Sequence, residues 1–133
     1  MRVRTRSPEE ILEIYEARIA LEATAAAGAA QRRSDFDLVR LARVHKSMIA
    51  TASSDPAAMA EANRAVHEAI WAASHNGTIV DLLTRLNNHL TRYPQTTLSA
   101  PGRWDEAIAE HAEIIDAIGG GMRIGLMGWR AST

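Results

Sequence analysis

Apolar residues recur along this chain at intervals of three and four, the spacing that lines one face of an α-helix. Five segments carry the pattern, and each follows residues typical of a helix start. We therefore expect helices over about residues 7–31, 34–49, 55–74, 78–90 and 103–118. No segment shows the alternation of apolar and polar positions typical of a strand, so the pattern predicts an all-α protein.

The predicted helix starts rest on specific capping residues. Ser7 reads as an N-cap, with Pro8 in the first turn and Glu10 completing a capping box. Asp55 precedes another proline and can cap the third helix in the same way. After the break His75-Asn76-Gly77, we expect Thr78 to cap the fourth helix.

The predicted helices each present an apolar stripe that we expect to face a common core. In chain order, the inward positions are Ile11, Ile14, Tyr15, Ile19 and Leu21; Leu38, Leu41, Val44, Met48 and Ile49; Met59, Val66, Ile70 and Trp71; Ile79, Leu82, Leu83, Leu86 and Leu90; and Ala107, Ile108, Ile114, Ile115 and Ile118.

Composition narrows the class of protein. The 133 residues suffice for one domain, 47% are hydrophobic and only 5% are aromatic, which favours closely packed helices. A net charge of −1 argues against a nucleic-acid surface, and the absence of cysteine excludes disulfides and thiolate metal sites. No apolar run approaches a membrane span. We expect a cytoplasmic protein without a membrane partner.

The end of the chain has a different character. Five of the eight glycines lie at or after residue 119, and no acidic residue follows Asp116. We therefore divide the chain into a residual linker over 1–6, a helical domain over 7–118 and an aberrant glycine-rich tail over 119–133.

Three polar side chains predict a site inside the bundle. Asn63 and His67 are four residues apart and share a helix face, and His111 lies among isoleucines on the fifth helix. Two inward imidazoles from different helices can hold Zn²⁺ or Ni²⁺, with an amide or water as oxygen ligand. The alternative is that each histidine is a hydrogen-bonded core residue, and spacing alone leaves both interpretations open. His45, His75 and His89 are expected at the surface or in loops.

Arg18 also has two interpretations. It precedes Glu22 by one helical turn, which suits an ion pair within the helix. It can also point inward and bind a carboxylate through two parallel hydrogen bonds. The sequence contains no P-loop, no GxGxxG and no catalytic triad, and no inward Glu or Asp is evident as a general base. We therefore expect no enzymatic activity, and a small metal-dependent hydrolase is the weakest alternative.

Three segments in this order resemble the ligand-binding (FCD) domain of FadR-subfamily GntR transcription regulators: EEILEIYEARIALEATAA (9–26), AEANRAVHEAIWAASHNGTIVDLL (60–83) and EHAEIIDAI (110–118). The resemblance implies an antiparallel helical bundle that binds a small organic-acid effector and forms a homodimer. It implies a divalent metal held by one Asp or Asn and three His, with Asn63, His67 and His111 at matching positions. Arg18 matches an arginine placed to meet the effector.

Two departures from the family pattern matter. The chain starts in what looks like the interdomain linker, so DNA would be reached only through a winged helix-turn-helix that is absent from this chain. The third histidine is missing, since none follows His111. A frameshift near Gly121 would explain the tail, because a shifted frame can encode a last helix ending in histidine. The nucleotide sequence decides this.

A second hypothesis treats the protein as a structural module. A bundle without its last helix would expose apolar surface and bury it in a dimer. In that case the ligand site would be vestigial.

Overall fold

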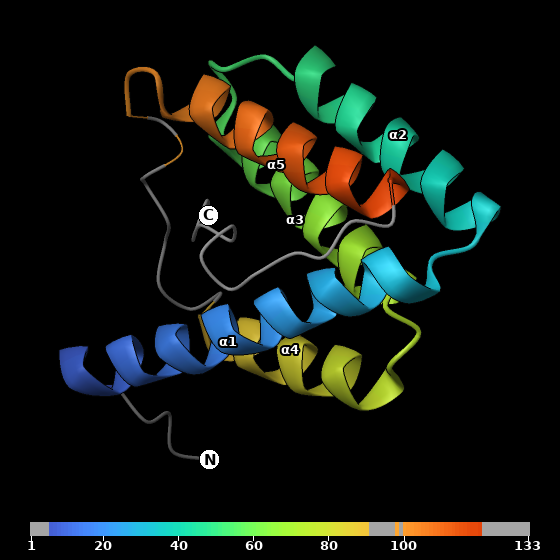
Figure 1. Cartoon of the computed structure of the whole chain (residues 1–133). Coiled ribbons are helices and arrows are strands. Elements are labelled where there is room, and N and C mark those ends of the chain that lie inside the picture. Colours follow the sequence, from blue (N-terminus) through green and yellow to red (C-terminus); the bar gives the residue numbers. More distant parts are fainter. Residues whose placement is uncertain (1–5, 91–97, 99, 121–133) are drawn as a thin grey trace.

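The computed structural model describes residues 6–90, 98 and 100–120 (Figure 1). Most of the expected linker and nearly all of the expected tail therefore lie outside the described residues. Within the described part there are five helices and no strand: α1 (Pro8–Arg32), α2 (Asp35–Ala50), α3 (Pro56–Ala73), α4 (Gly77–Leu90) and α5 (Arg103–Gly119). The predicted all-α class is confirmed.

The helices form a bundle in which α1 packs against α3, α4 and α5, and α2 packs against α3 and α5. Helices α2, α3 and α5 lie side by side, with α2 antiparallel to the other two, and α1 crosses their ends with α4 packed beside it (Figure 1). Alanines on the inner face of α1 are fully buried, which lets the partner helices approach closely. None of the described helices is long and apolar enough to span a lipid bilayer.

The predicted caps are formed with one exception. Ser7 Oγ accepts a hydrogen bond from the Glu10 backbone N–H at 3.2 Å, and Asp55 Oδ1 accepts one from Ala58 at 3.1 Å. The prediction that Thr78 caps the fourth helix is wrong. Asn76 Oδ1 accepts the Ile79 N–H at 3.1 Å, so α4 begins one residue earlier, at Gly77. Asparagine is among the strongest N-caps, and here it outcompetes threonine.

Half of the predicted stripe positions are buried, nine are partly buried and three are exposed. None of the five positions expected inward on the first helix is buried, because the buried side of α1 carries Arg18, Glu22 and a run of alanines. Ile19, Ile49 and Leu82 expose 36%, 56% and 41% of their surface. Each lies at the edge of its apolar stripe. Successive residues of a helix are rotated by about 100° around its axis, so a residue at the edge of the stripe faces solvent. Met48, next to Ile49, is completely buried and fills the inward position instead.

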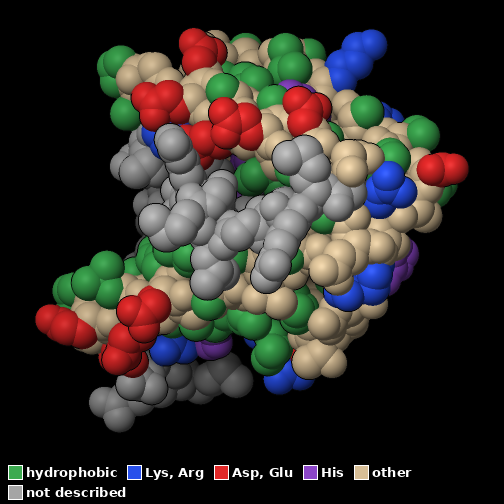
Figure 2. Space-filling view, viewed as in Figure 1, with side chains coloured by type: hydrophobic (Ala, Val, Ile, Leu, Met, Phe, Trp, Pro, Cys, Tyr) green, Lys and Arg blue, Asp and Glu red, His purple; other side chains and the backbone are tan. Residues whose placement is uncertain are grey.

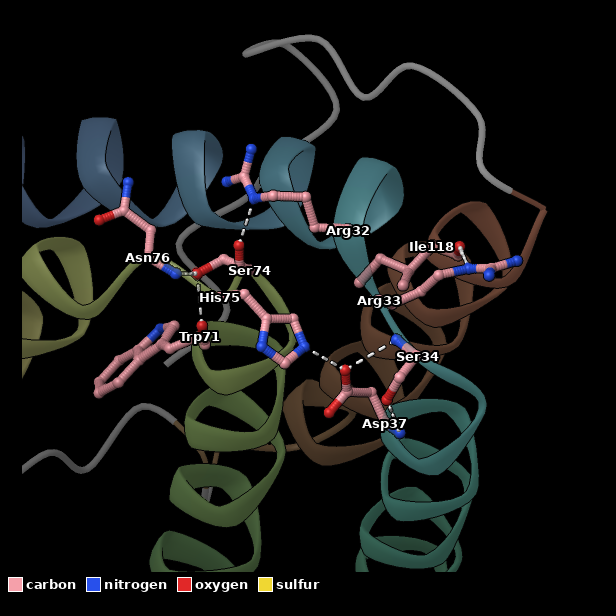
Figure 3. Close-up of polar contacts among 9 residues, drawn as sticks. All are labelled: Arg32, Arg33, Ser34, Asp37, Trp71, Ser74, His75, Asn76 and Ile118. Carbon is pink, nitrogen blue, oxygen red and sulfur yellow. Dashed lines mark hydrogen bonds and ion pairs between the residues drawn. The ribbon is translucent and has the colours of Figure 1, made fainter.

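Two arginines at the end of α1 hold the ends of two other helices (Figure 3). Arg32 Nε donates to the Ser74 carbonyl at 2.6 Å, at the end of α3. Arg33 donates from Nε to the Ile118 carbonyl at 3.2 Å and from Nη2 to the Gly119 carbonyl at 2.9 Å. The last carbonyls of a helix lack partners within the helix and carry partial negative charge. These contacts therefore fix where α3 and α5 end relative to α1.

A second contact near the ends of α1 and α3 joins α2 to the turn after α3. His75 has a left-handed backbone, with φ of 50°, and its Nε2 lies 2.6 Å from Asp37 Oδ2. The same oxygen accepts the Ser34 backbone N–H at 2.9 Å (Figure 3). Burial tends to raise the pKa of Asp37, but the hydrogen bonds from Ser34 and His75 outweigh it and hold that pKa below its usual value. The carboxylate thus stabilises an otherwise strained turn.

The Asp37 contacts predict an acid-dependent loss of stability. A carboxylate with a lowered folded-state pKa contributes fully above its unfolded pKa of about 4, and the contribution disappears as pH falls through the folded-state pKa. We expect Asp37→Asn to lower the free energy of unfolding by about 1 kcal/mol at pH 7, and the two proteins to converge towards pH 2. Urea denaturation across this pH range measures the difference.

The matched control is Asp35→Asn, which removes the same charge from an exposed position in the same helical turn. A constant difference between wild type and Asp37→Asn at every pH would contradict the prediction.

Candidate functional site: a buried imidazole pair

Two of the predicted site residues face each other in the core. His67 on α3 and His111 on α5 expose 2% and 0% of their surface. Their Nε2 atoms are 3.2 Å apart, and the rings meet edge to face with centroids separated by 4.9 Å. Both helices pack against α1 and α2, so the rings meet in the space that the four helices enclose. The expectation that both imidazoles point inward is confirmed by this geometry.

Glu22 on α1 completes the arrangement around His67. Its carboxylate Oε1 lies 3.0 Å from His67 Nδ1, and the side chain is 2% exposed. The expectation that no acidic side chain points inward is therefore wrong. A signal existed, because Glu22 shares the face of Arg18 and directly precedes a run of small residues that packs closely. A charged side chain on a closely packed face must be buried with partners.

Arg18 forms the ion pair that its sequence position suggested and also lies inward, and its binding of a ligand carboxylate stays a prediction. It is 94% buried, given a relative exposure of 6%, and its Nε lies 3.4 Å from the same Glu22 oxygen that contacts His67. The ion pair within the helix is therefore formed, and the guanidinium also points inward. Arg18 Nε has no hydrogen-bond partner among the described residues, since 3.4 Å is long for a hydrogen bond here.

Asn63 lies one turn before His67 and is also buried, with 5% exposure. Within the described part of the chain, its Oδ1 has no hydrogen-bond partner. A buried acceptor without a partner costs about 1 to 3 kcal/mol, so proteins rarely retain one without a use. An unpaired amide oxygen on the same helix face as His67 is a ligand type that suits a cation.

The charges at the centre restrict where hydrogens lie. Burial tends to raise the pKa of Glu22, but the charges and hydrogen bond of His67 and the charge of Arg18 hold it below its usual value, so Glu22 is ionised at pH 7. An ionised carboxylate only accepts, so His67 Nδ1 donates to it and Nε2 is left to face His111. Burial, aided by His67, lowers the pKa of His111 to about 2, so that ring is neutral.

The two imidazoles are hydrogen-bonded to each other in the core, and their separation is also that of two ligands of one metal ion. Zinc bonds to imidazole nitrogen are about 2.0–2.1 Å long, which places two nitrogens of a tetrahedral site about 3.3 Å apart. The observed Nε2 separation is 3.2 Å. Among the described residues, no group of three or more His, Asp or Glu side chains converges as a metal cage. The two imidazoles therefore fit an open site, to which the Asn63 amide would add an oxygen ligand, and the described residues do not form a closed structural one.

The remaining histidines differ in exposure. His75 and His89 are exposed, as expected. His45 on α2 is only partly exposed, because its Nε2 lies 3.1 Å from the Ile108 carbonyl on α5. None of the three contacts the imidazole pair by a hydrogen bond given by the structure.

The unpaired Asn63 oxygen predicts a gain in stability when it is removed. Asn63→Leu replaces a buried acceptor with an apolar side chain of similar size, so the metal-free protein should gain about 1 kcal/mol in its free energy of unfolding. Thermal and urea unfolding in the presence of a chelator measure this. Asn87→Leu, at a partly buried position on α4, is the comparison that reports the general effect of added apolar surface. If Asn63→Leu is instead less stable than wild type, the Asn63 amide stabilises the metal-free fold and the prediction is wrong.

Comparison with protein-family models identifies the family of this chain. The FCD domain matches residues 13–123, which cover most of α1, all of α2 to α5 and the whole imidazole site. A comparison with curated proteins finds no match. The FCD domain is the ligand-binding, regulatory domain of GntR-type transcription regulators and is not a catalytic family. The match spans most of the chain and agrees with the all-helical bundle, and the chain belongs to the FCD domain family.

Proposed function

We propose that this domain senses a small organic acid at the centre of the bundle, where a divalent metal held by His67, His111 and Asn63 helps to bind it. The observation that carries the proposal is the pair of Nε2 atoms, 3.2 Å apart in a fully buried space. The third histidine of the family pattern is not among the residues after His111. Water or an oxygen of the effector would fill the open positions.

Glu22 supports the metal proposal through the geometry of His67. By accepting the hydrogen on Nδ1, it keeps the lone pair of Nε2 directed at His111 and makes that nitrogen more basic. A carboxylate behind a ligating histidine is a recurrent arrangement in metal sites. Zn²⁺ or Ni²⁺, when bound here, would supply a positive charge that attracts carboxylate oxygens. Glu22 would act as a positioning residue and not as a ligand.

Charge balance favours an acidic effector. The buried charges of Arg18 and Glu22 offset each other, and the His111 ring is neutral. A divalent ion would add two positive charges to this water-poor space, and anionic groups of a ligand would compensate them. Arg18 is the fixed cation at the edge of the group, and its Nε lacks a hydrogen-bond partner in the described part of the chain. We therefore assign it the role of binding the effector's carboxylate.

The effector would regulate the protein by binding one of its two conformations more tightly than the other. We propose that the domain acts as a homodimer, and that DNA is contacted through a winged helix-turn-helix of the GntR type. An effector that binds one arrangement of the dimer better than the other shifts the equilibrium by that difference. A purely structural bundle with a vestigial site is less well supported, since such a bundle gains little from a buried Arg–Glu–His chain.

The proposed metal site predicts binding of one Ni²⁺ or Zn²⁺ ion per chain. His67→Ala and His111→Ala should each remove most of the affinity for the metal, because each variant leaves only one imidazole to hold the ion. Glu22→Gln should weaken binding about 10- to 100-fold by removing the charge behind His67. Titration calorimetry with the metal alone, or competition against a chromophoric chelator, measures these affinities.

His89→Ala is the matched control, since His89 is exposed on α4. Circular dichroism of each variant checks that the helices remain formed. The metal proposal fails if wild type and the double variant His67→Ala/His111→Ala bind the ion equally weakly.

The proposed effector site predicts that a small carboxylic acid stabilises the protein. A ligand present at 100 times its dissociation constant adds about 2.7 kcal/mol, which raises the melting temperature by several degrees. A thermal-shift panel of mono-, di- and tricarboxylates, with and without Zn²⁺, should give a hit. Arg18→Met should abolish the shift and Arg18→Lys should reduce it, because lysine keeps the charge but loses the planar fork.

Arg64→Met, which removes an exposed guanidinium from α3, is the comparison for this panel. Equal shifts for wild type and Arg18→Met would show that Arg18 does not hold the acid. If no acid in the panel shifts the wild type, the assignment of the effector class is overturned.

A further inference from the structure

The outer face of α1 combines exposed apolar and acidic side chains. Leu12 and Ile19 expose 68% and 36% of their surface and lie seven residues apart, on one side of the helix. Three exposed glutamates share this side, and we call the five residues the acidic face: Glu9, Leu12, Glu13, Glu16 and Ile19. From Pro8 to Ala17, α1 contains no basic residue.

The outer face of α2 has the same design with opposite charge. Phe36 and Val39 expose 76% and 67% of their surface, and together with Leu12 they are the three most exposed large apolar side chains of the described residues. Three basic residues lie on the same side, and we call the set the basic face: Phe36, Val39, Arg40, Arg43 and Lys46. No acidic residue occurs between Asp37 and the end of α2. Both faces therefore have the mixed apolar and charged composition of a contact surface.

Within the described part of the chain, the charged side chains of these two faces are not paired with each other or with other charges. None of the three glutamates and none of the three cations forms an ion pair among the described residues. The space-filling view shows acidic and apolar side chains together along the α1 arm at the lower left, and basic beside apolar side chains towards α2 at the right (Figure 2). The two faces lie at different places on the surface, so one chain does not bring them together.

We propose that the partner of these faces is a second copy of this chain, with the acidic face of α1 in one protomer docked on the basic face of α2 in the other. Three negative charges meet three positive ones, and Leu12 and Ile19 cover Phe36 and Val39. Each chain carries both faces, so two chains can satisfy them reciprocally about a twofold axis. Complementary charges set the register and speed association, and the apolar side chains supply the buried area. The inference rests on the homodimer of the proposed function and names its interface.

Two charge-reversal variants test the assignment. The first, Glu9→Lys/Glu13→Lys/Glu16→Lys, gives a chain whose two faces are both basic. The second, Arg40→Glu/Arg43→Glu/Lys46→Glu, gives a chain whose two faces are both acidic. Each variant alone should dissociate at least roughly tenfold more readily than wild type, because like charges face each other. An equimolar mixture should associate again, since the reversed α1 of one meets the reversed α2 of the other. Sedimentation velocity and light scattering measure the masses.

A third variant controls for net charge. Glu68→Lys/Glu113→Lys/Asp116→Lys changes the charge by the same amount as the α1 reversal, at exposed positions outside both faces. It should associate like wild type. Phe36→Ser should weaken association without lowering the melting temperature at low protein concentration, because this side chain is 76% exposed.

The outcomes separate this inference from the homodimer on which it rests. A wild-type protein that is monomeric at all concentrations overturns both. A wild-type dimer that both reversals leave intact, or that their mixture fails to restore, overturns the interface and leaves the homodimer to another surface. Restoration of association only in the mixture supports the interface.

Discussion

The buried carboxylate of Glu22 is the constraint on which the centre of this bundle depends. One of its oxygens lies 3.0 Å from His67 Nδ1 and 3.4 Å from Arg18 Nε, with almost no exposure to water. An ion taken into such a space requires partners of opposite charge or strong donors, or it would instead be neutralised. Glu22 therefore fixes the orientation of His67 and keeps Arg18 inside. The Nε2 lone pair of His67 is in turn directed at His111, so the arrangement of four side chains on three helices follows from one ion.

The rest of the fold holds these helices where the carboxylate can act. Small residues after Glu22 let α3 and α5 approach α1 closely, because alanine side chains add little width to a helix. Arg32 and Arg33 bind the last carbonyls of α3 and α5, and so limit how far either helix can slide along α1. A sliding movement of about 1.5 Å, one residue of helical rise, would separate imidazole nitrogens that are now 3.2 Å apart. The contacts of Arg32 and Arg33 therefore help to keep the two imidazoles at this distance.

The sequence predicted the elements well and the pairing of polar side chains less well, for physical reasons. Helix starts are local, since Ser7 and Asp55 need only their own first turns to form caps, and these predictions hold. Asn76 and Thr78 compete for one helix start, and the choice depends on the turn geometry that His75 and Asp37 create from two elements. Helical spacing placed His67 and His111 inward, but it cannot rank a charged residue such as Glu22 as buried. That ranking requires knowing its partners, and one of them, His67, comes from another helix.

The same chain of contacts explains why a sensing role suits this core better than a purely structural one. A core selected for stability alone would replace Arg18, Glu22 and the two histidines with apolar side chains, which often costs nothing and can stabilise a protein. Here the charges balance without a ligand, yet Asn63 Oδ1 and Arg18 Nε, an acceptor and a donor, lack hydrogen-bond partners among the described residues. A cation satisfies the first and an anion satisfies the second. The charge of a metal ion and the charge of a carboxylate would also offset each other inside the core. Each ligand would therefore bind more tightly in the presence of the other.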